Sequence, residues 1–244
     1  MTFRGHCTVP IINQVRRLAQ AADAGVVRFA VALLGIDVFF VAVFVAQRLY
    51  RASFYDYVPM IGERWHLGLD WSYPEVFGYL KTLIIASLLI TIPGKRHRPI
   101  CLALILIFTV VLLDDAAQVH ERLGQGLAGA LGFQWFAGRI SRHFGELIVW
   151  GILSVLLLAG LCAALVRSPR QDRTNGLLFL AAIAVLALFA VVADLAHVLA
   201  NNRFRGADLL FTLIEEGGEQ MTLSLICGLT LLIHREQLRR ASDS

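Results

Sequence analysis

Six long apolar segments constrain this chain more than any other feature of its sequence. They cover residues 29–46, 76–93, 100–119, 147–166, 176–200 and 209–233. Each is close to the roughly 20 residues that an α-helix needs to cross about 30 Å of hydrocarbon. Hydrophobic residues make up 57% of the chain and charged residues 16%, whereas a soluble domain is about half apolar and a quarter charged. The sequence therefore predicts a membrane protein and excludes a disordered or disulfide-stapled chain.

The apolar segments have the pattern of helices rather than of strands. Only helices and closed barrels satisfy every backbone polar group inside a bilayer, and barrel strands alternate with a period of two. The run LLFLAAIAVLALFAVV at residues 177–192 shows no such alternation. We therefore predict an all-α polytopic membrane bundle of about six transmembrane helices. Residues 1–28 form an N-terminal arm, residues 29–233 the transmembrane domain, and residues 234–244 a tail.

The distribution of basic residues predicts the orientation. Of the 22 Lys and Arg, thirteen lie in connections on the N-terminal side of the bundle, eight lie on the opposite side, and Lys81 lies inside a span. Cytoplasmic connections carry the excess of basic residues in membrane proteins. Both termini are therefore predicted to be cytoplasmic, in a multi-pass protein of the cell inner (plasma) membrane. This topology accounts for the net charge of +4 without a nucleic-acid partner.

The N-terminal arm contains a short amphipathic pattern. Ile12, Val15 and Ala19 recur at helical spacing beside Arg16 and Arg17. Such a pattern is typical of a helix that lies on the lipid surface, which makes membrane lipid a predicted partner. A solvated arm without a lipid contact is the alternative.

Ionisable residues within the predicted spans gather at one depth. The third and fifth spans run outward and end in acidic and histidine residues, while the sixth runs inward and begins with acidic residues. Because a charge at the bilayer centre costs roughly 2.5–3.5 kcal/mol on insertion scales, each of these residues needs a reason to be there. We predict that they meet in the outer third of the bundle. The candidate metal ligands are Asp114, His120, Glu121, Asp194, His197, Glu215 and Glu219.

Helical spacing predicts which of these side chains share a face. Asp114, Gln118 and Glu121 follow the pattern i, i+4, i+7 and are expected to share one face. Asp115 and Glu216 lie off the faces of their neighbours. We therefore expect those two carboxylates to contact solvent or loop backbone rather than the cluster.

Several carboxylates in a low dielectric must share protons, pair with basic groups or bind a cation. Lys81 is a candidate counter-charge, and Asp37, midway along the first span, is expected to be bonded within the bundle. About four carboxylates and two imidazoles form the ligand set of carboxylate-bridged di-iron sites in helical bundles. Oxygen and nitrogen ligands without thiolate suit iron, manganese or zinc. The sequence therefore predicts a divalent metal, with iron or manganese favoured over zinc.

These observations favour a metal-dependent membrane oxidoreductase that acts on a lipid-like or small-molecule substrate. A zinc-dependent membrane hydrolase is an alternative, with Glu121 or Glu219 as the general base. A proton or cation transporter would use the same acids, and a haem b protein would use His120 and His197 as axial ligands. A non-catalytic assembly factor is a further alternative. The outer connections, residues 48–74 and 122–143, are aromatic or glycine-rich and form either a lid or an interfacial filler.

Overall fold

The computed structural model describes residues 8–53, 63–93, 98–132, 139–201 and 207–242, and these residues form helices without any strand. The α-helices are α1 (Thr8–Ala21), α2 (Ala24–Ser53), α3 (Tyr73–Ile90), α4 (Arg98–Ala117), α5 (Val119–Ala130), α6 (Arg139–Arg167), α7 (Arg170–Ala187), α8 (Asp194–Asn201) and α9 (Ala207–Ser242). A short 3-10 turn, η1 (Glu63–Trp65), precedes α3, and a π-helical turn, η4 (Leu188–Ala193), joins α7 to α8. The predicted all-α class is confirmed.

Five helices in the described part of the chain are long and apolar enough to cross a membrane. They are Ala24–Tyr50, Tyr73–Ile90, Pro99–Ala117, His143–Arg167 and Arg170–Ala200, which correspond to the first five predicted spans.

The sixth predicted span forms part of α9, which is not among these five helices. Its first half carries Glu215, Glu216 and Glu219, and the helix contacts α2, α3, α7 and α8. Acidic residues at membrane depth are tolerated where they face the interior of a bundle, so this central position explains how α9 carries them. The helix continues to Ser242, so most of the predicted tail extends it.

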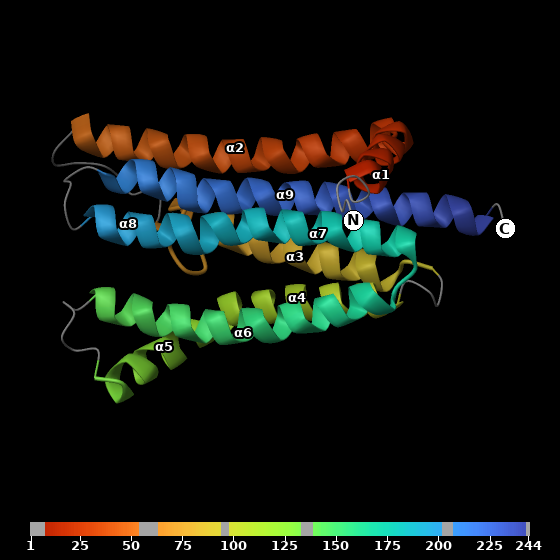
Figure 1. Cartoon of the computed structure of the whole chain (residues 1–244). Helices are drawn as coiled ribbons and strands as arrows, with labels where there is room; N and C mark the ends of the chain where they lie inside the picture. Colours follow the sequence, from red (N-terminus) through yellow and green to blue (C-terminus); the bar gives the residue numbers. More distant parts are fainter. Residues whose placement is uncertain (1–7, 54–62, 94–97, 133–138, 202–206, 243–244) are drawn as a thin grey trace.

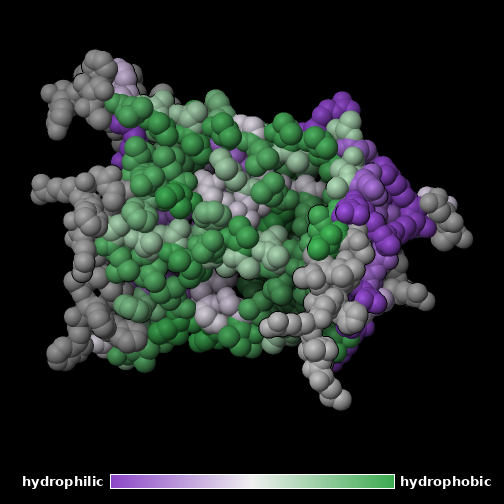
Figure 2. Space-filling model, turned by 45° about the horizontal axis from the view of Figure 1, so that its top comes forward, coloured by the Kyte–Doolittle hydropathy of each residue, from purple (hydrophilic) through white to green (hydrophobic). Residues whose placement is uncertain are grey.

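The long helices run side by side, and the two ends of the bundle differ (Figure 1). α1 and the C-terminal end of α9 lie at one end, whereas α5, α8 and the start of α9 lie at the other. Apolar surface covers the middle of the molecule in Figure 2, and hydrophilic surface gathers at the end that holds α1 and the C-terminus. This distribution is the one expected of a bundle whose middle contacts lipid. We call the two ends the α1 end and the α5 end.

A fully buried ion pair joins α2, α3 and α9 in the middle of the bundle. The Lys81 ammonium donates to Asp37 Oδ1 at 2.9 Å and to the Gln220 carbonyl at 2.7 Å, and both charged side chains are 0% exposed. The Ser224 hydroxyl donates to Asp37 Oδ2 at 2.5 Å. Asp37 is therefore bonded within the bundle, as predicted. Lys81 pairs with Asp37, whereas we had expected it to neutralise the acids of the α5 end.

Two glycines allow α5 to lie against the start of α6. A Cβ atom added to Gly145 would lie 2.1 Å from the carbonyl oxygen of Gly124, and one added to Gly124 would lie 2.6 Å from the backbone nitrogen of Glu146. Real Cβ atoms do not approach backbone this closely, so both positions require glycine. The contact holds α5, which carries His120, at a fixed place on the bundle.

Asp23 connects the start of α2 to the end of α9 at the α1 end. Its Oδ1 accepts the backbone N–H groups of Gly25 and Val26 at 2.9 Å, and Arg235 Nη1 donates to its two oxygens at 2.6 and 2.7 Å. The Val26 N–H and the Arg235 guanidinium hold the pKa of Asp23 below its usual value of 3.8. The ionised carboxylate is therefore the form that the fold binds.

This lowered pKa predicts a dependence of stability on pH. A carboxylate with a lowered pKa in the folded state contributes stability above its unfolded pKa, and that contribution is lost as the pH falls through the folded value. We expect thermal unfolding in detergent to show a loss of stability below about pH 4 that is smaller in Asp23→Asn. Asp23→Asn should also be less stable than the natural protein at pH 7. Identical profiles for the two proteins would contradict this role of Asp23.

Candidate functional site

Carboxylates and imidazoles of α4, α5, α6, α8 and α9 gather at the α5 end. α4 ends at Ala117 and α5 begins at Val119, with Gln118 between them in the left-handed conformation (φ 52°, ψ 43°). This conformation is unfavourable for a residue other than glycine, so the surrounding structure must hold it in place. The break separates α5 from α4, and His120, just after it, contacts Asp114 in the last turn of α4.

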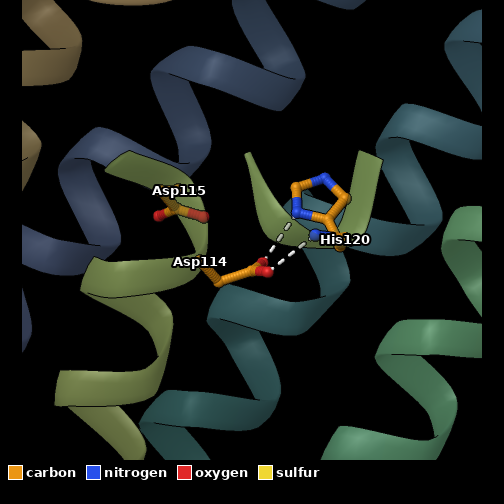
Figure 3. Close-up of side chains that lie close together, drawn as sticks. All are labelled: Asp114, Asp115 and His120. Atoms are coloured by element: carbon orange, nitrogen blue, oxygen red, sulfur yellow. Dashed lines mark hydrogen bonds and ion pairs between the residues drawn. The ribbon is translucent and has the colours of Figure 1, made fainter. Parts of the chain in front are cut away.

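The first group of the site joins these two helices. The His120 backbone N–H donates to Asp114 Oδ1 at 2.9 Å, and the His120 ring nitrogen Nδ1 lies 2.7 Å from Asp114 Oδ2 (Figure 3). One ligand atom from each of Asp114, Asp115 and His120 lies within 4.8 Å of the others. Asp114 is 3% exposed, whereas the His120 side chain is 22% exposed. The group is thus buried on the α4 side and accessible on the α5 side.

The electrostatics of this group favour a cation. Burial lowers the pKa of His120, but the hydrogen bond and the charge of Asp114 act in the opposite direction, and the net pKa is raised. Asp115 and Glu121 add to this effect. The carboxylates around the ring therefore favour its positively charged form.

A second group brings α6 to the start of α8. His143 Nδ1 lies 3.1 Å from Glu146 Oε2 and 3.7 Å from Asp194 Oδ2. The Asp194 carboxyl group is in turn hydrogen-bonded to Glu215 on α9. Sequence reasoning missed His143, although its i, i+3 spacing to Glu146 was a signal that could have identified it.

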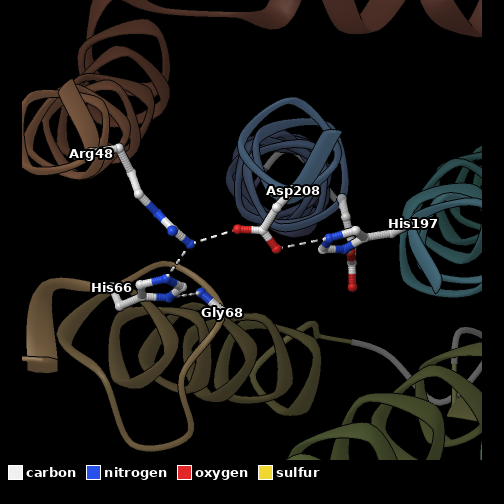
Figure 4. A network of polar contacts seen from close by, with 6 residues as sticks. Arg48, His66, Gly68, His197 and Asp208 are labelled. Carbon is white, nitrogen blue, oxygen red and sulfur yellow. Dashed lines mark hydrogen bonds and ion pairs between the residues drawn. The ribbon is translucent and has the colours of Figure 1, made fainter. Parts of the chain in front are cut away.

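A third group surrounds His197 on α8 (Figure 4). His197 Nδ1 lies 2.6 Å from Glu215 Oε2, and His197 Nε2 lies 3.4 Å from Asp208 Oδ1. Arg48 on α2 donates to Asp208 Oδ2 at 2.8 Å and lies 3.1 Å from His66 Nε2. Both ring nitrogens of His197 therefore already face carboxylates, and Arg48 supplies a positive charge to this side of the site.

The glutamates of α9 connect these groups. The charge of Asp115 acts on Glu219, and so do the charges of Glu215 and Asp194. The charges of Glu219 and Glu215 act on Glu216. The Glu216 carboxylate also lies close to Gly68 in the loop before α3, because a Cβ atom added to Gly68 would be 2.8 Å from Glu216 Oε1. Glu216 therefore lies against the loop before α3, as expected. Asp115 has a ligand atom within 4.8 Å of those of Asp114 and His120, so the expectation that it contacts only solvent or loop backbone was wrong. Asp115 joins the cluster because α4 and α5 do not form one continuous helix.

The π-helical turn η4 directly precedes Asp194, the first residue of α8. It adds a wide turn immediately before α8, and α8 then packs along α9. π-helical turns inside α-helices occur frequently at functional sites. Phe189 of this turn lies against Gly218 of α9, where an added Cβ would be 2.3 Å from Phe189 Cδ1. The glycine thus allows α9 to approach η4 closely at the depth of the site.

The structure therefore brings the predicted residues to one end of the bundle but divides them between neighbouring groups. Asp114 and His120 share the first group, with Glu121 close enough to act on His120. Asp194, Glu215 and His197 form the connected part on α8 and α9, and Glu219 lies between the two parts. Residues 54–62 and 133–138 of the outer connections lie outside the described residues, so neither a lid nor an interfacial filler is assigned to them.

Fold and site together define a polytopic helical membrane protein with a partly buried carboxylate–histidine cluster at one end of its bundle. Residues 26–233 match the family described as a domain of unknown function, DUF8692, and the chain belongs to this family. No curated protein and no solved structure matches the chain.

Proposed function

We propose that this protein is a membrane metalloprotein in which Asp114, Asp115 and His120 hold a divalent metal ion. The observation that carries the proposal is the mutual approach of their ligand atoms to within 4.8 Å. Metal–ligand bonds to carboxylate oxygen and histidine nitrogen are about 2.0–2.2 Å long, so two ligand atoms of one ion lie at most about 4.4 Å apart, and the three side chains would move closer together on binding an ion. Three protein ligands leave coordination positions for water or a substrate.

The charge balance of the cluster supports a bound cation. Asp115, Asp194, Glu215 and Glu75 all act electrostatically on Glu219. Lys81 is bonded to Asp37 in the middle of the bundle. Arg48 is bonded to Asp208 at the edge of the cluster. A divalent ion would supply positive charge where the carboxylates are densest, without requiring them to take up several protons.

The ligand types favour iron or manganese, with zinc as the alternative, because they are carboxylate oxygen and imidazole nitrogen without thiolate. We propose the activity of a metal-dependent oxidoreductase that acts on a lipid-like or small-molecule substrate. When bound, iron or manganese would supply the redox chemistry of such a reaction. Glu219, beside Asp115, and Glu121, beside His120, are the proposed proton-transfer groups of the site. The partial exposure of His120 gives a substrate access from the α5 side.

Elemental analysis of detergent-purified protein that has never met a chelator tests this proposal. We expect near-stoichiometric iron or manganese in the natural protein. His120→Ala and Asp115→Asn should each lower occupancy at least about tenfold, because even the partners of metal ligands affect affinity about 10–100-fold. His234→Ala is the matched control. That histidine lies near the α1 end of α9, bonded to Thr91 Oγ1 at 3.0 Å, and its removal should leave the metal in place.

Four other results would redirect or refute the proposal. Stoichiometric zinc that depends on His120 would retain the site but favour the hydrolase. A Soret band in the visible spectrum would favour the haem alternative. Absence of metal from the natural protein, or full occupancy in His120→Ala with an unchanged circular dichroism spectrum, would show that Asp114, Asp115 and His120 do not form a metal site.

A further inference from the structure

α1 lies across the α1 end of the bundle, at a steep angle to the long helices (Figure 1). It contacts α7 and α9. Gln14 and Leu18 face these helices and are each 4% exposed. The Gln14 amide donates to Asn175 Oδ1 at 2.9 Å and to Glu236 Oε2 at 3.4 Å. These bonds fix the rotation of α1 about its own axis, so the directions of its other faces are determined.

The rest of α1 presents two different surfaces. Ile12, Val15 and Ala19 follow one another at helical spacing on a face beside the one that contacts the bundle. Ile12 is 57% exposed and Val15 is 48% exposed. Arg16 and Gln20 continue around the helix on its polar side, and both are exposed. A helix with one face on protein, one apolar face open and one polar face open is suited to the boundary between acyl chains and headgroups.

The charge at this end indicates which lipid would be bound. The exposed arginines of the described residues here are Arg16, Arg17, Arg28, Arg167, Arg170, Arg173 and Arg239. Of the acids of the described residues here, Asp23 and Glu236 pair with Arg235 and Arg240 respectively, and Asp172 is buried. The hydrophilic surface at this end in Figure 2 is therefore dominated by positive charge. Phosphate groups of anionic phospholipids are complementary to it.

We propose that α1 is an interfacial anchor that binds an anionic phospholipid leaflet. In this arrangement Ile12 and Val15 enter the boundary of the acyl chains, while Arg16 and Arg17 contact the lipid phosphates. The excess of arginine at the α1 end identifies the leaflet as the cytoplasmic one. The anchor lies at the opposite end from the carboxylate–histidine cluster and does not depend on the metal proposal.

The depth of α1 can be measured with the full chain in vesicles of phosphatidylglycerol and phosphatidylcholine. Val15→Trp and Gln20→Trp each add one tryptophan to the four native ones, at exposed positions on the apolar and the polar side of α1. Phospholipids with brominated acyl chains quench tryptophans that contact those chains. We expect quenching of the added fluorescence to be at least about twofold greater for Val15→Trp than for Gln20→Trp, because only the apolar face enters the acyl region.

The preference for anionic lipid is tested by binding of phosphatidylglycerol to the detergent-purified chain, measured by native mass spectrometry. Each arginine near an anionic surface contributes about fivefold in affinity, so Arg16→Gln with Arg17→Gln should weaken binding about 30-fold. Arg64→Gln with Arg122→Gln removes two exposed arginines from the α5 end and should have little effect. Phosphatidylcholine binding should be unchanged in both double variants.

Three results would overturn the anchor. Equal quenching of Val15→Trp and Gln20→Trp would show that the apolar face is not in the acyl region. Shielding of Val15→Trp from aqueous acrylamide without quenching by brominated lipid would show that a protein covers the face instead. Equal phosphatidylglycerol affinity in the natural protein and the Arg16/Arg17 double variant would exclude these arginines as the headgroup contacts.

Discussion

Replacing Lys81 by methionine is expected to destabilise the protein by roughly 3–5 kcal/mol, because it leaves the Asp37 carboxylate buried without its counter-charge. Both side chains are 0% exposed, and the remaining partner of Asp37 is the Ser224 hydroxyl. The same change also removes the donor to the Gln220 carbonyl on α9. Thermal or denaturant unfolding in detergent measures the effect, with yield from membranes as a second readout.

The matched control removes both charges at once. Lys81→Met with Asp37→Leu replaces the pair by apolar groups and should recover most of the lost stability, since an apolar replacement of a buried ion pair is often neutral or stabilising. Asp37→Leu alone leaves Lys81 unpaired and should be destabilised to an extent similar to that of Lys81→Met alone. Wild-type stability in either single variant would contradict a structural role for the pair.

Replacing Gly145 by valine is expected to separate α5 from α6. Its Cβ would lie 2.1 Å from the Gly124 carbonyl oxygen, and a backbone atom cannot move aside as a side chain can. We expect a loss at the upper end of the roughly 1–3 kcal/mol that is typical of overpacking. Because α5 carries His120, the variant should also lose bound metal. Circular dichroism, unfolding in detergent and elemental analysis measure these effects together.

Gly151→Ala, in the same helix, is the control for this prediction. Nothing lies within 4 Å of a Cβ atom added there, so the substitution should be neutral or slightly stabilising through its effect on helix propensity. A Gly145→Val protein with the stability and metal content of the Gly151→Ala protein would show that α5 does not depend on this contact.

Much of the fold could be predicted from the sequence because the constraints that set it are local. A helix that crosses lipid must be apolar over its whole length, so the spans can be read from composition alone. All six predicted spans are helical, and five of them have the apolarity of a membrane span. The depth of the acidic residues was also predictable, because successive spans run in opposite directions. Asp114, Asp194 and Glu215 therefore reach the same end of the bundle.

The grouping within the cluster could not be predicted, because it depends on where a helix breaks and on which helices become neighbours. Gln118 adopts a left-handed conformation without a glycine to signal it, and this break brings His120 back to Asp114 and Asp115. His143 approaches Asp194 only because α6 packs beside α8.

The sequence by itself determined an all-α membrane bundle with acids and histidines at one end and arginines in excess at the other. These features follow from the length, apolarity and charge of each segment, which do not depend on how the segments pack together. The tertiary structure alone decided the partner of each ionisable group. It paired Lys81 with Asp37, and it enclosed His197 between Glu215 and Asp208. Charge pairing inside a bundle depends on distances of a few ångströms between helices, and no spacing within one helix specifies those distances.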